Sequence, residues 1–300
     1  MPPDVNGIVT PVQTPFDDHG NLVLEQVEDS VEFAIECGSV AIVAAGTGVQ
    51  ETPSLTPDER ESLISETLDA VDGRVPVFAG CAYPAKPVAA RLANHAADAG
   101  ADALLSFPPW GTTPTTTSVE RYYEDLAAET DLPLLLYNNP TVTIDLPREV
   151  MARIAEINGV EYVKETSRNF QKISWLLEHV QRPGNADVFG TYDVLLGLLL
   201  SGGSGAVVPT PATVPAVKVF EAYRNDNLEA AMEHQRTFTR FPPEKVESNG
   251  LMQVMKAGAE IAGVAVGPPR NPYHCEALDG DERDALEQWM TENDVPRMTQ

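Results

Sequence analysis

Positive charge is scarce in this chain. Its 300 residues include 45 acidic but only 20 basic side chains, so the formal net charge is −25. The sequence has no basic stripe, which argues against nucleic acid as a partner. Like charges on this scale repel one another and salt screens that repulsion, so the acidity indicates a solvated shell suited to high salt, as in halophiles. A surface for a cationic partner is the alternative, but the acidic residues are spread along the chain rather than gathered in a tail.

Cysteines and long apolar runs are also sparse. Cys37, Cys81 and Cys275 are odd in number and widely spaced, so the sequence predicts neither a disulfide framework nor a zinc site. The N-terminus has neither the charged region nor the apolar core of a signal peptide, and no run of 18 apolar residues occurs. We therefore expect a cytoplasmic protein that does not associate with membranes.

Short apolar runs alternate with helical patterns along most of the chain. Eight strand–helix alternations joined by short loops predict a parallel sheet closed as a (β/α)₈ TIM barrel over residues 1–210. Residues 211–300 are expected to be C-terminal helices that complete and extend the barrel. A doubly wound sheet would need a phosphate-binding glycine loop after its first strand, and Thr10-Pro11-Val12-Gln13 is not one. The expected strands cover 7–12, 40–45, 75–80, 103–107, 132–137, 159–164, 186–190 and 205–208.

Helix signals fall between these strands and after them. Thr56 and Pro57 are typical of a helix start, and Ser118 is expected to cap a helix that runs to about residue 130. The other helical patterns cover 23–37, 87–99, 147–157, 169–180 and 193–201, and the best C-terminal candidates are 228–241, 249–261 and 281–290.

The stretch from Gly159 to Ser167 carries the clearest chemistry. A β-branched and aromatic run ends at Lys164, which predicts a buried strand that delivers an amine to its C-terminal end. An amine among apolar neighbours loses hydration, which favours the neutral, nucleophilic form that attacks a ketone to give a Schiff base. Tyr137 is expected at the end of the adjacent strand, where a phenol passes protons to and from the intermediates.

Each of these residues also has a plain structural interpretation. Lys164 alone is typical of a strand-end lysine that reaches solvent, and Tyr137 alone is typical of a core aromatic. The loop of Thr47 and its neighbouring glycines offers a hydroxyl and backbone N–H groups for a carboxylate, but it also suits an ordinary turn. Only the combination favours a catalytic site.

Four short motifs occur in an order along the chain that resembles the pattern of a known protein family. They are Thr14-Pro15-Phe16, Tyr137-Asn138-Asn139-Pro140, Val163-Lys164-Glu165-Thr166-Ser167, and Gly190-x-x-Asp193 followed by Gly202-Gly203-Ser204-Gly205. They resemble the TPF, YNxP, K-E-x-S and G-x-D…GAxG segments of the pyruvate-dependent class I aldolases, the dihydrodipicolinate synthase/N-acetylneuraminate lyase superfamily. The resemblance runs from residue 7 to about residue 278.

The resemblance implies a barrel with a helical extension, usually a homotetramer, acting on a small 2-keto acid without a metal or an organic cofactor. It implies that Lys164 forms the Schiff base and that Tyr137 transfers protons. The substrate-binding positions that we expect around them are Thr47, Gly48, Val49, Trp110, Thr166, Gly190 and Val207, the last through its main-chain carbonyl.

Three departures from the family pattern bear on the substrate. Most members carry GTTGE after the second strand, and residues 46–51 read GTGVQE. Alignment from Glu51 onward puts Gly48 and Val49 at the threonine positions, whereas alignment from Gly46 keeps one hydroxyl and lengthens the loop. Trp110 replaces the tyrosine that dihydrodipicolinate synthases lend across a subunit interface, and Val142 replaces their carboxylate-binding arginine.

These departures favour a substrate derived from a sugar. Without the arginine, an aldehyde that bears a carboxylate lacks its counter-charge. The preferred function is therefore aldol cleavage of a 2-keto-3-deoxy sugar acid, of the 2-keto-3-deoxygluconate type, to pyruvate and an aldehyde. The alternatives are a dehydratase that uses the same lysine, a hydratase-aldolase for aromatic aldehydes, a dihydrodipicolinate synthase, and a non-catalytic keto-acid binder.

Overall fold

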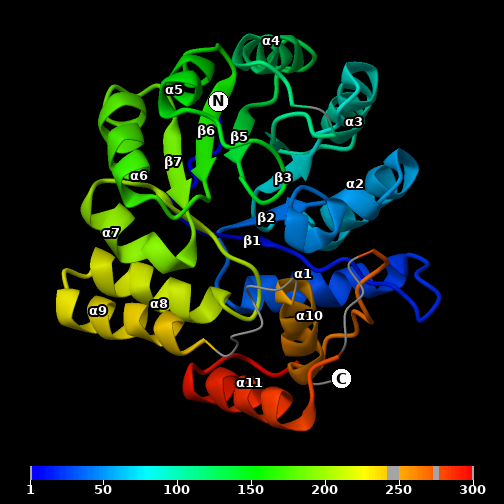
Figure 1. Ribbon diagram of the computed structural model, residues 1–300. Coiled ribbons are helices and arrows are strands. Elements are labelled where there is room, and N and C mark those ends of the chain that lie inside the picture. Colours follow the sequence, from blue (N-terminus) through cyan, green and yellow to red (C-terminus); the bar gives the residue numbers. More distant parts are fainter. Residues whose placement is uncertain (1, 112, 242–249, 273–276, 299–300) are drawn as a thin grey trace.

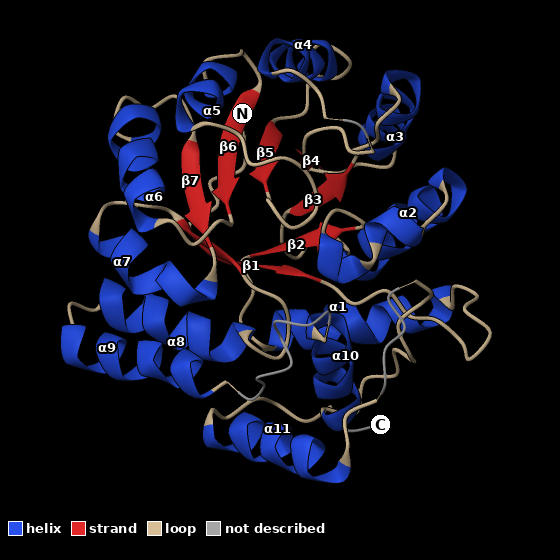
Figure 2. Cartoon of the chain, viewed as in Figure 1, coloured by secondary structure: helices blue, strands red, loops and turns tan. Residues whose placement is uncertain are grey.

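Eight parallel strands close into a barrel in chain order, with helices around the outside (Figures 1 and 2). The computed structural model describes residues 2–111, 113–241, 250–272 and 277–298, so Cys275 lies outside the described residues. The expected (β/α)₈ fold is confirmed. The strands are β1 (Gly7–Pro11), β2 (Ala41–Ala44), β3 (Val77–Gly80), β4 (Ala103–Ser106), β5 (Leu134–Asn138), β6 (Val160–Glu165), β7 (Asp187–Gly190) and β8 (Gly205–Val207).

Both faces of the strands are buried, which explains their continuous apolar character. Ile8 on β1 and Ala206 on β8 join the core between the sheet and the helices, whereas their neighbours Val9 and Val207 join a separate cluster inside the barrel. Alternate side chains therefore fill the two layers. A side chain at the C-terminal end of a strand therefore lies at the barrel mouth when it is on the same face of the strand as the inner cluster.

In the part of the chain that the structure describes, the helices α1 to α8 surround the barrel, and α8 completes it. The helix α8 was not among the best candidates in the sequence, but it contacts β1, α7 and α9. The helix α6 continues into a π-helical turn at Leu177–Gln181. The eight are α1 (Val27–Glu36), α2 (Pro57–Val71), α3 (Lys86–Asp98), α4 (Thr116–Ala127), α5 (Arg148–Ala155), α6 (Phe170–Leu176), α7 (Leu195–Leu200) and α8 (Thr213–Arg224).

One expected helix cap is wrong. The helix α4 begins three residues earlier than predicted, because Thr115 is the N-cap and its hydroxyl accepts a hydrogen bond from the backbone N–H of Ser118 at 3.2 Å. This part of the chain offers several hydroxyl side chains in succession, and spacing alone does not select the one that caps.

Among the described residues after the barrel, the α-helices are α9 (Leu228–Arg236), α10 (Leu251–Ile261) and α11 (Gly280–Glu292). Figure 1 shows α11 at the base of the view, below α10 and next to the C-terminus. The division of the chain at residue 210 stays a prediction. Within the described ranges, no helix combines the length and the apolar character that a membrane span requires.

Candidate active site

Lys164 and Tyr137 lie opposite each other on neighbouring strands. The register of β5 and β6 pairs the two residues directly, and each has only 4% of its surface exposed. The Lys164 Nζ atom is 4.0 Å from the centroid of the Tyr137 ring. The Tyr137 hydroxyl accepts a hydrogen bond from the Asn139 side-chain amide at 2.9 Å. A buried amine and an oriented phenol therefore share the C-terminal end of the barrel, where enzymes of this fold do their chemistry.

The residues that follow Tyr137 and Lys164, Asn138 and Glu165, stabilise the pairing of β5 with β6. Asn138 donates a hydrogen bond of 2.9 Å to the Glu165 carboxylate, and that carboxylate is fully buried. The Lys172 amine, also buried, lies 2.9 Å from Glu165 and 2.6 Å from Asp145. The sequence did not predict that Lys172 supports the site. A signal was available, because the chain has very few lysines and this one lies near the start of α6.

An aromatic series extends from Tyr137 along one wall of the barrel mouth. The Tyr137 ring lies 6.0 Å from Phe107, and the Phe107 ring lies 5.1 Å from Trp110, both measured between centroids. Trp110 in turn contacts Tyr83 at 5.8 Å. Trp110 is partly buried against the inner cluster of the barrel, so the expected site residue does lie at this wall.

The loop after β2 is held by a buried glutamine. The Gln50 side-chain oxygen accepts hydrogen bonds from the backbone N–H groups of Gly46 and Thr47, at 2.9 and 3.1 Å, and from the Thr47 hydroxyl at 3.2 Å. Its amide nitrogen donates to the carbonyls of Val12 and Val43. The Thr47 donors are thus directed to Gln50, an arrangement that the sequence analysis did not anticipate.

Gly48 and Val49 follow on the turn Gly48–Gln50 and are partly exposed. Among the described residues, no hydrogen bond uses their backbone N–H groups as donors. Val142 lies beside them, since a Cβ atom built on Gly48 would be 3.2 Å from its Cγ2 atom. Val142 also packs against the inner cluster that contains Tyr137. The structure therefore brings this turn to the same mouth as the lysine and the tyrosine.

The other expected site residues lie at the ends of β6, β7 and β8. The Thr166 backbone N–H bonds to the Asn138 carbonyl at 3.1 Å, and its buried Oγ1 atom has no hydrogen-bond partner within the described ranges. Val207 belongs to the inner cluster. At Gly190 a Cβ atom would lie 2.8 Å from the Leu198 side chain of α7, so a larger residue there would require Leu198 to shift.

This geometry agrees with the comparisons to known proteins. The model of the dihydrodipicolinate synthetase family matches residues 4–293. This chain belongs to that family. An uncharacterized DapA-like lyase of Halobacterium salinarum is 31% identical over 95% of this chain and 93% of the relative. A 4-hydroxy-tetrahydrodipicolinate synthase of Methanothrix thermoacetophila is 30% identical, with 93% of each protein covered.

A solved dihydrodipicolinate synthase from Thermotoga maritima superposes with a TM-score of 0.88 and 26% identity, covering 98% of this chain and all of that one. As a member of the dihydrodipicolinate synthetase family, the chain is a lyase of the class I aldolase type. The expected membership is thereby confirmed, and the individual substrate is addressed below.

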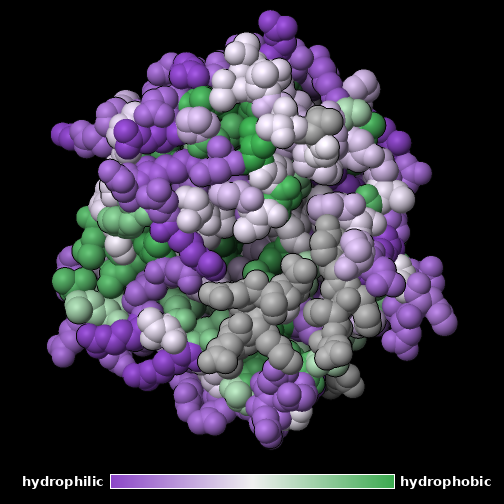
Figure 3. All heavy atoms as spheres, in the orientation of Figure 1, coloured by the Kyte–Doolittle hydropathy of each residue, from purple (hydrophilic) through white to green (hydrophobic). Residues whose placement is uncertain are grey.

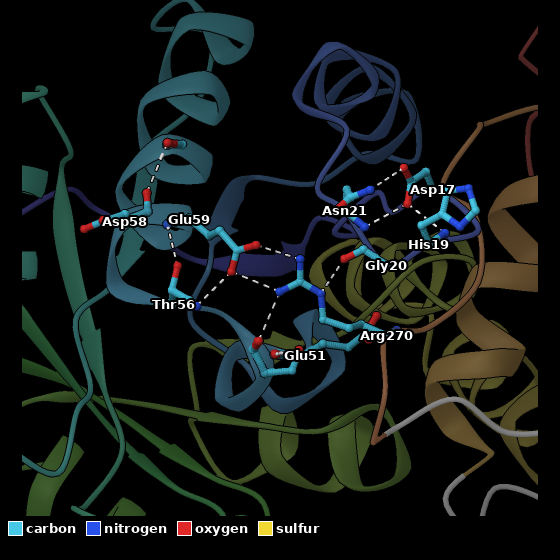
Figure 4. Close-up of polar contacts among 11 residues, drawn as sticks. Asp17, His19, Gly20, Asn21, Glu51, Thr56, Asp58, Glu59 and Arg270 are labelled. Carbon is cyan, nitrogen blue, oxygen red and sulfur yellow. Dashed lines mark hydrogen bonds and ion pairs between the residues drawn. The ribbon is translucent and has the colours of Figure 1, made fainter.

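In this family member, the C-terminal extension reaches the loop after β2 (Figure 4). The Arg270 guanidinium makes two hydrogen bonds to Glu59, at 2.6 and 2.9 Å, and donates to the carbonyls of Gly20 and Ser54. Its backbone N–H donates to Glu51 at 2.6 Å. The hydrogen bonds from Arg270 hold the pKa of Glu59 below its usual value, against the opposing effect of partial burial.

Glu51 forms a second link with the extension. Its fully buried carboxylate lies 2.9 Å from the Lys256 amine of α10, which also donates to the Pro268 carbonyl at 3.0 Å. Burial raises the pKa of Glu51 and lowers that of Lys256, while the mutual attraction of the two groups works against both shifts. Two basic residues of the extension thus anchor the segment that carries the turn at Gly48 and Val49.

Proposed function

We propose that this chain cleaves a 2-keto-3-deoxy sugar acid, of the 2-keto-3-deoxygluconate type, to pyruvate and an aldehyde through a Schiff base on Lys164. The observation that carries the proposal is the buried Lys164 amine, 4.0 Å from the centre of the Tyr137 ring at the carboxyl ends of adjacent strands. An amine in this setting is a nucleophile for a ketone, and the neighbouring phenol is a proton carrier.

The proposed reaction begins when the Lys164 amine attacks C2 of the keto acid. The carbinolamine loses water and becomes an iminium ion. Tyr137 then takes the proton of the C4 hydroxyl, the C3–C4 bond breaks, and its electron pair moves into the iminium to form an enamine. The aldehyde leaves, C3 gains a proton, and water hydrolyses the iminium to release pyruvate. The lysine is itself the electron sink, so the proposal requires neither a metal nor an organic cofactor.

The turn at Gly48 and Val49 is proposed to bind the keto-acid carboxylate. Both backbone N–H groups lack another partner among the described residues, whereas the Thr47 donors are directed to Gln50. This assignment favours the alignment in which Gly48 and Val49 occupy the threonine positions of GTTGE, with Thr47 supporting the turn. Thr166, Gly190 and Val207 are proposed to line the remaining ends of the strands around the substrate.

Val142 and Trp110 support a sugar-derived substrate. Val142 lies next to Gly48 and offers no positive charge to a second carboxylate. Trp110 presents an aromatic surface at the mouth and has no hydroxyl with which to relay a proton. The two residues therefore disfavour an aldehyde partner that bears its own carboxylate, which is what a dihydrodipicolinate synthase takes.

A homotetramer that works at high salt is also proposed. Leu200, Leu228 and Met232 are exposed by 57%, 46% and 43%, and Figure 3 shows hydrophobic surface over α7 and α9 at the left of the view. Exposed apolar surface of this kind is typical of a subunit interface. The net charge of −25 is the support for adaptation to salt.

The identity of the products tests the proposed reaction. The protein is incubated with 2-keto-3-deoxygluconate in molar salt, and the products are identified by mass spectrometry. Pyruvate with glyceraldehyde is the expected result. A semialdehyde formed with loss of water would replace the aldolase with the dehydratase, and pyruvate binding without any turnover would favour the non-catalytic binder.

A further inference from the structure

Gln13 is a buried side chain that makes no side-chain hydrogen bond to the described residues. Only 2% of its surface is exposed, and neither its Nε2 nor its Oε1 atom has a hydrogen-bond partner in the part of the chain that the structure describes. An amide buried in this way lowers stability, because both polar atoms lose their bonds to water. Gln50, the other buried glutamine nearby, uses both ends of its amide. The unpaired Gln13 amide is therefore available to bind a ligand.

The backbone places Gln13 at the barrel mouth. Val9 on β1 lies in the inner cluster, whereas Val12 lies in the outer core and donates its backbone N–H to Val43 at 3.3 Å, so the chain is still extended there. Because side chains alternate along an extended segment, Gln13 falls on the inner side, beyond the carboxyl end of β1. Figure 1 shows β1 beside β2.

The neighbours of Gln13 tie it to the proposed carboxylate loop. The Val12 carbonyl accepts a hydrogen bond from Gln50 at 3.0 Å, and the Thr14 hydroxyl donates to the Gln50 carbonyl at 2.8 Å. The residues on either side of Gln13 are therefore held by Gln50, which also holds the N–H groups of Gly46 and Thr47. Gln13 thus has a fixed backbone next to the loop, with a side chain that is free to bond to a ligand.

We propose that Gln13 is a specificity-determining residue whose amide hydrogen-bonds the hydroxylated part of a 2-keto acid bound to Lys164. This inference rests on the proposed function. An amide suits the task because its oxygen accepts from a sugar hydroxyl and its nitrogen donates to another. A polyhydroxylated chain satisfies both atoms, whereas pyruvate alone is too short to carry such hydroxyls.

The test compares two ligand concentrations, one for 2-keto-3-deoxygluconate and one for pyruvate, each being the concentration at which half of the protein is trapped at Lys164. Borohydride reduction traps the ligand on Lys164, and intact mass gives the fraction trapped with pyruvate and with 2-keto-3-deoxygluconate. Gln13→Met keeps the length of the side chain and removes its hydrogen bonds. We expect the half-saturating concentration of the sugar acid to rise about five- to tenfold, as for the loss of one or two hydrogen bonds, and that of pyruvate to stay unchanged.

Thr10→Val is the matched control on the same strand. The Thr10 hydroxyl lies 3.1 Å from that of Thr213 and accepts a hydrogen bond from Ser39 at 2.5 Å, in the outer layer. This variant should melt at a lower temperature with the concentration ratio unchanged. Gln13→Met should melt at the same temperature as the wild type or higher, because the free protein loses no hydrogen bond.

The outcomes separate the two proposals. If wild-type protein gives no pyruvate adduct, the proposed function fails and this inference falls with it. If the wild type gives both adducts and Gln13→Met leaves the ratio unchanged, the proposed function stands and the role of Gln13 is overturned. A melting temperature that falls in Gln13→Met as it does in Thr10→Val would also overturn it, because the amide would then be bonded within the protein.

Discussion

At the scale of single residues, the support of the site depends on a buried charge. Lys172 lies within 2.9 Å of Glu165 and 2.6 Å of Asp145, and the Glu165 carboxylate is fully buried. Glu165 immediately follows Lys164 and accepts hydrogen bonds from Asn138, which immediately follows Tyr137. The charge of Lys172 therefore stabilises the segment that orients both proposed catalytic residues.

Substitution of Lys172 tests this dependence. Lys172→Met should lower the free energy of unfolding by about 3–5 kcal/mol, because it leaves the Glu165 charge buried without compensation. The double variant Lys172→Met with Glu165→Gln should recover most of that loss. Urea denaturation at fixed salt gives the three values. A loss below about 1 kcal/mol in the single variant would contradict the account, since that is the size expected for an exposed pair.

The sequence predicted the two central residues but not the groups that hold them. Lys164 and Tyr137 could be placed because strand ends in a parallel barrel meet at one edge, so neighbouring strands bring their terminal residues together. Gln50 could not be placed in the same way. Its bonds reach β1, β2 and its own loop, and such a tertiary network has no periodic pattern in the sequence.

At the scale of elements, the extension after the barrel is joined to the active-site loop. Arg270 connects two segments that are far from it in the chain. It bonds to the loop at Gly20 and to Glu59 at the start of α2 (Figure 4), and also to the Ser54 carbonyl just before that helix. The strands and most helices were predictable from their periods. This connection was not, because a single arginine in an irregular segment carries no local signal of its partner.

The ion pair between Glu59 and Arg270 predicts that stability depends on pH. The pKa of Glu59 in the folded protein is lowered from 4.5, chiefly by hydrogen bonds from Arg270. The stabilisation is therefore present above the unfolded-state pKa and is lost as the pH falls through the folded-state pKa. Glu59→Gln should cost about 1–2 kcal/mol at pH 7, allowing for partial exposure of the pair, and nothing once the pH is below the folded-state pKa.

The control for this experiment is a pair on the surface. Glu233 and Arg236 are 2.7 Å apart with side chains 61% and 56% exposed, so Glu233→Gln should leave the melting temperature nearly unchanged at either pH. Thermal denaturation at pH 7 and at progressively lower pH measures both variants. A penalty for Glu59→Gln that does not shrink with acidification would show that the carboxylate charge is not the source of its stabilisation.

At the scale of the whole molecule, the formal net charge of −25 predicts that stability depends on salt. Repulsion among surface carboxylates acts over a Debye length, which is about 8 Å at physiological ionic strength and about 3 Å at 1 M salt. The melting temperature should therefore rise as sodium chloride is increased from low to molar concentration. Sucrose at equal osmolarity is the control and should raise it less, because it does not screen charge. A melting temperature that is flat or falls with salt would contradict the proposed adaptation.

The proposed function depends on a Schiff base between Lys164 and a 2-keto acid. The most direct measurement is intact mass after incubation with pyruvate and borohydride in molar salt, with Lys164→Ala and the exposed-lysine variant Lys86→Ala in parallel. We expect a single reduced pyruvate adduct in the wild type and in Lys86→Ala, and none in Lys164→Ala. No adduct in folded wild-type protein, or an adduct that persists in Lys164→Ala, would contradict the proposed function.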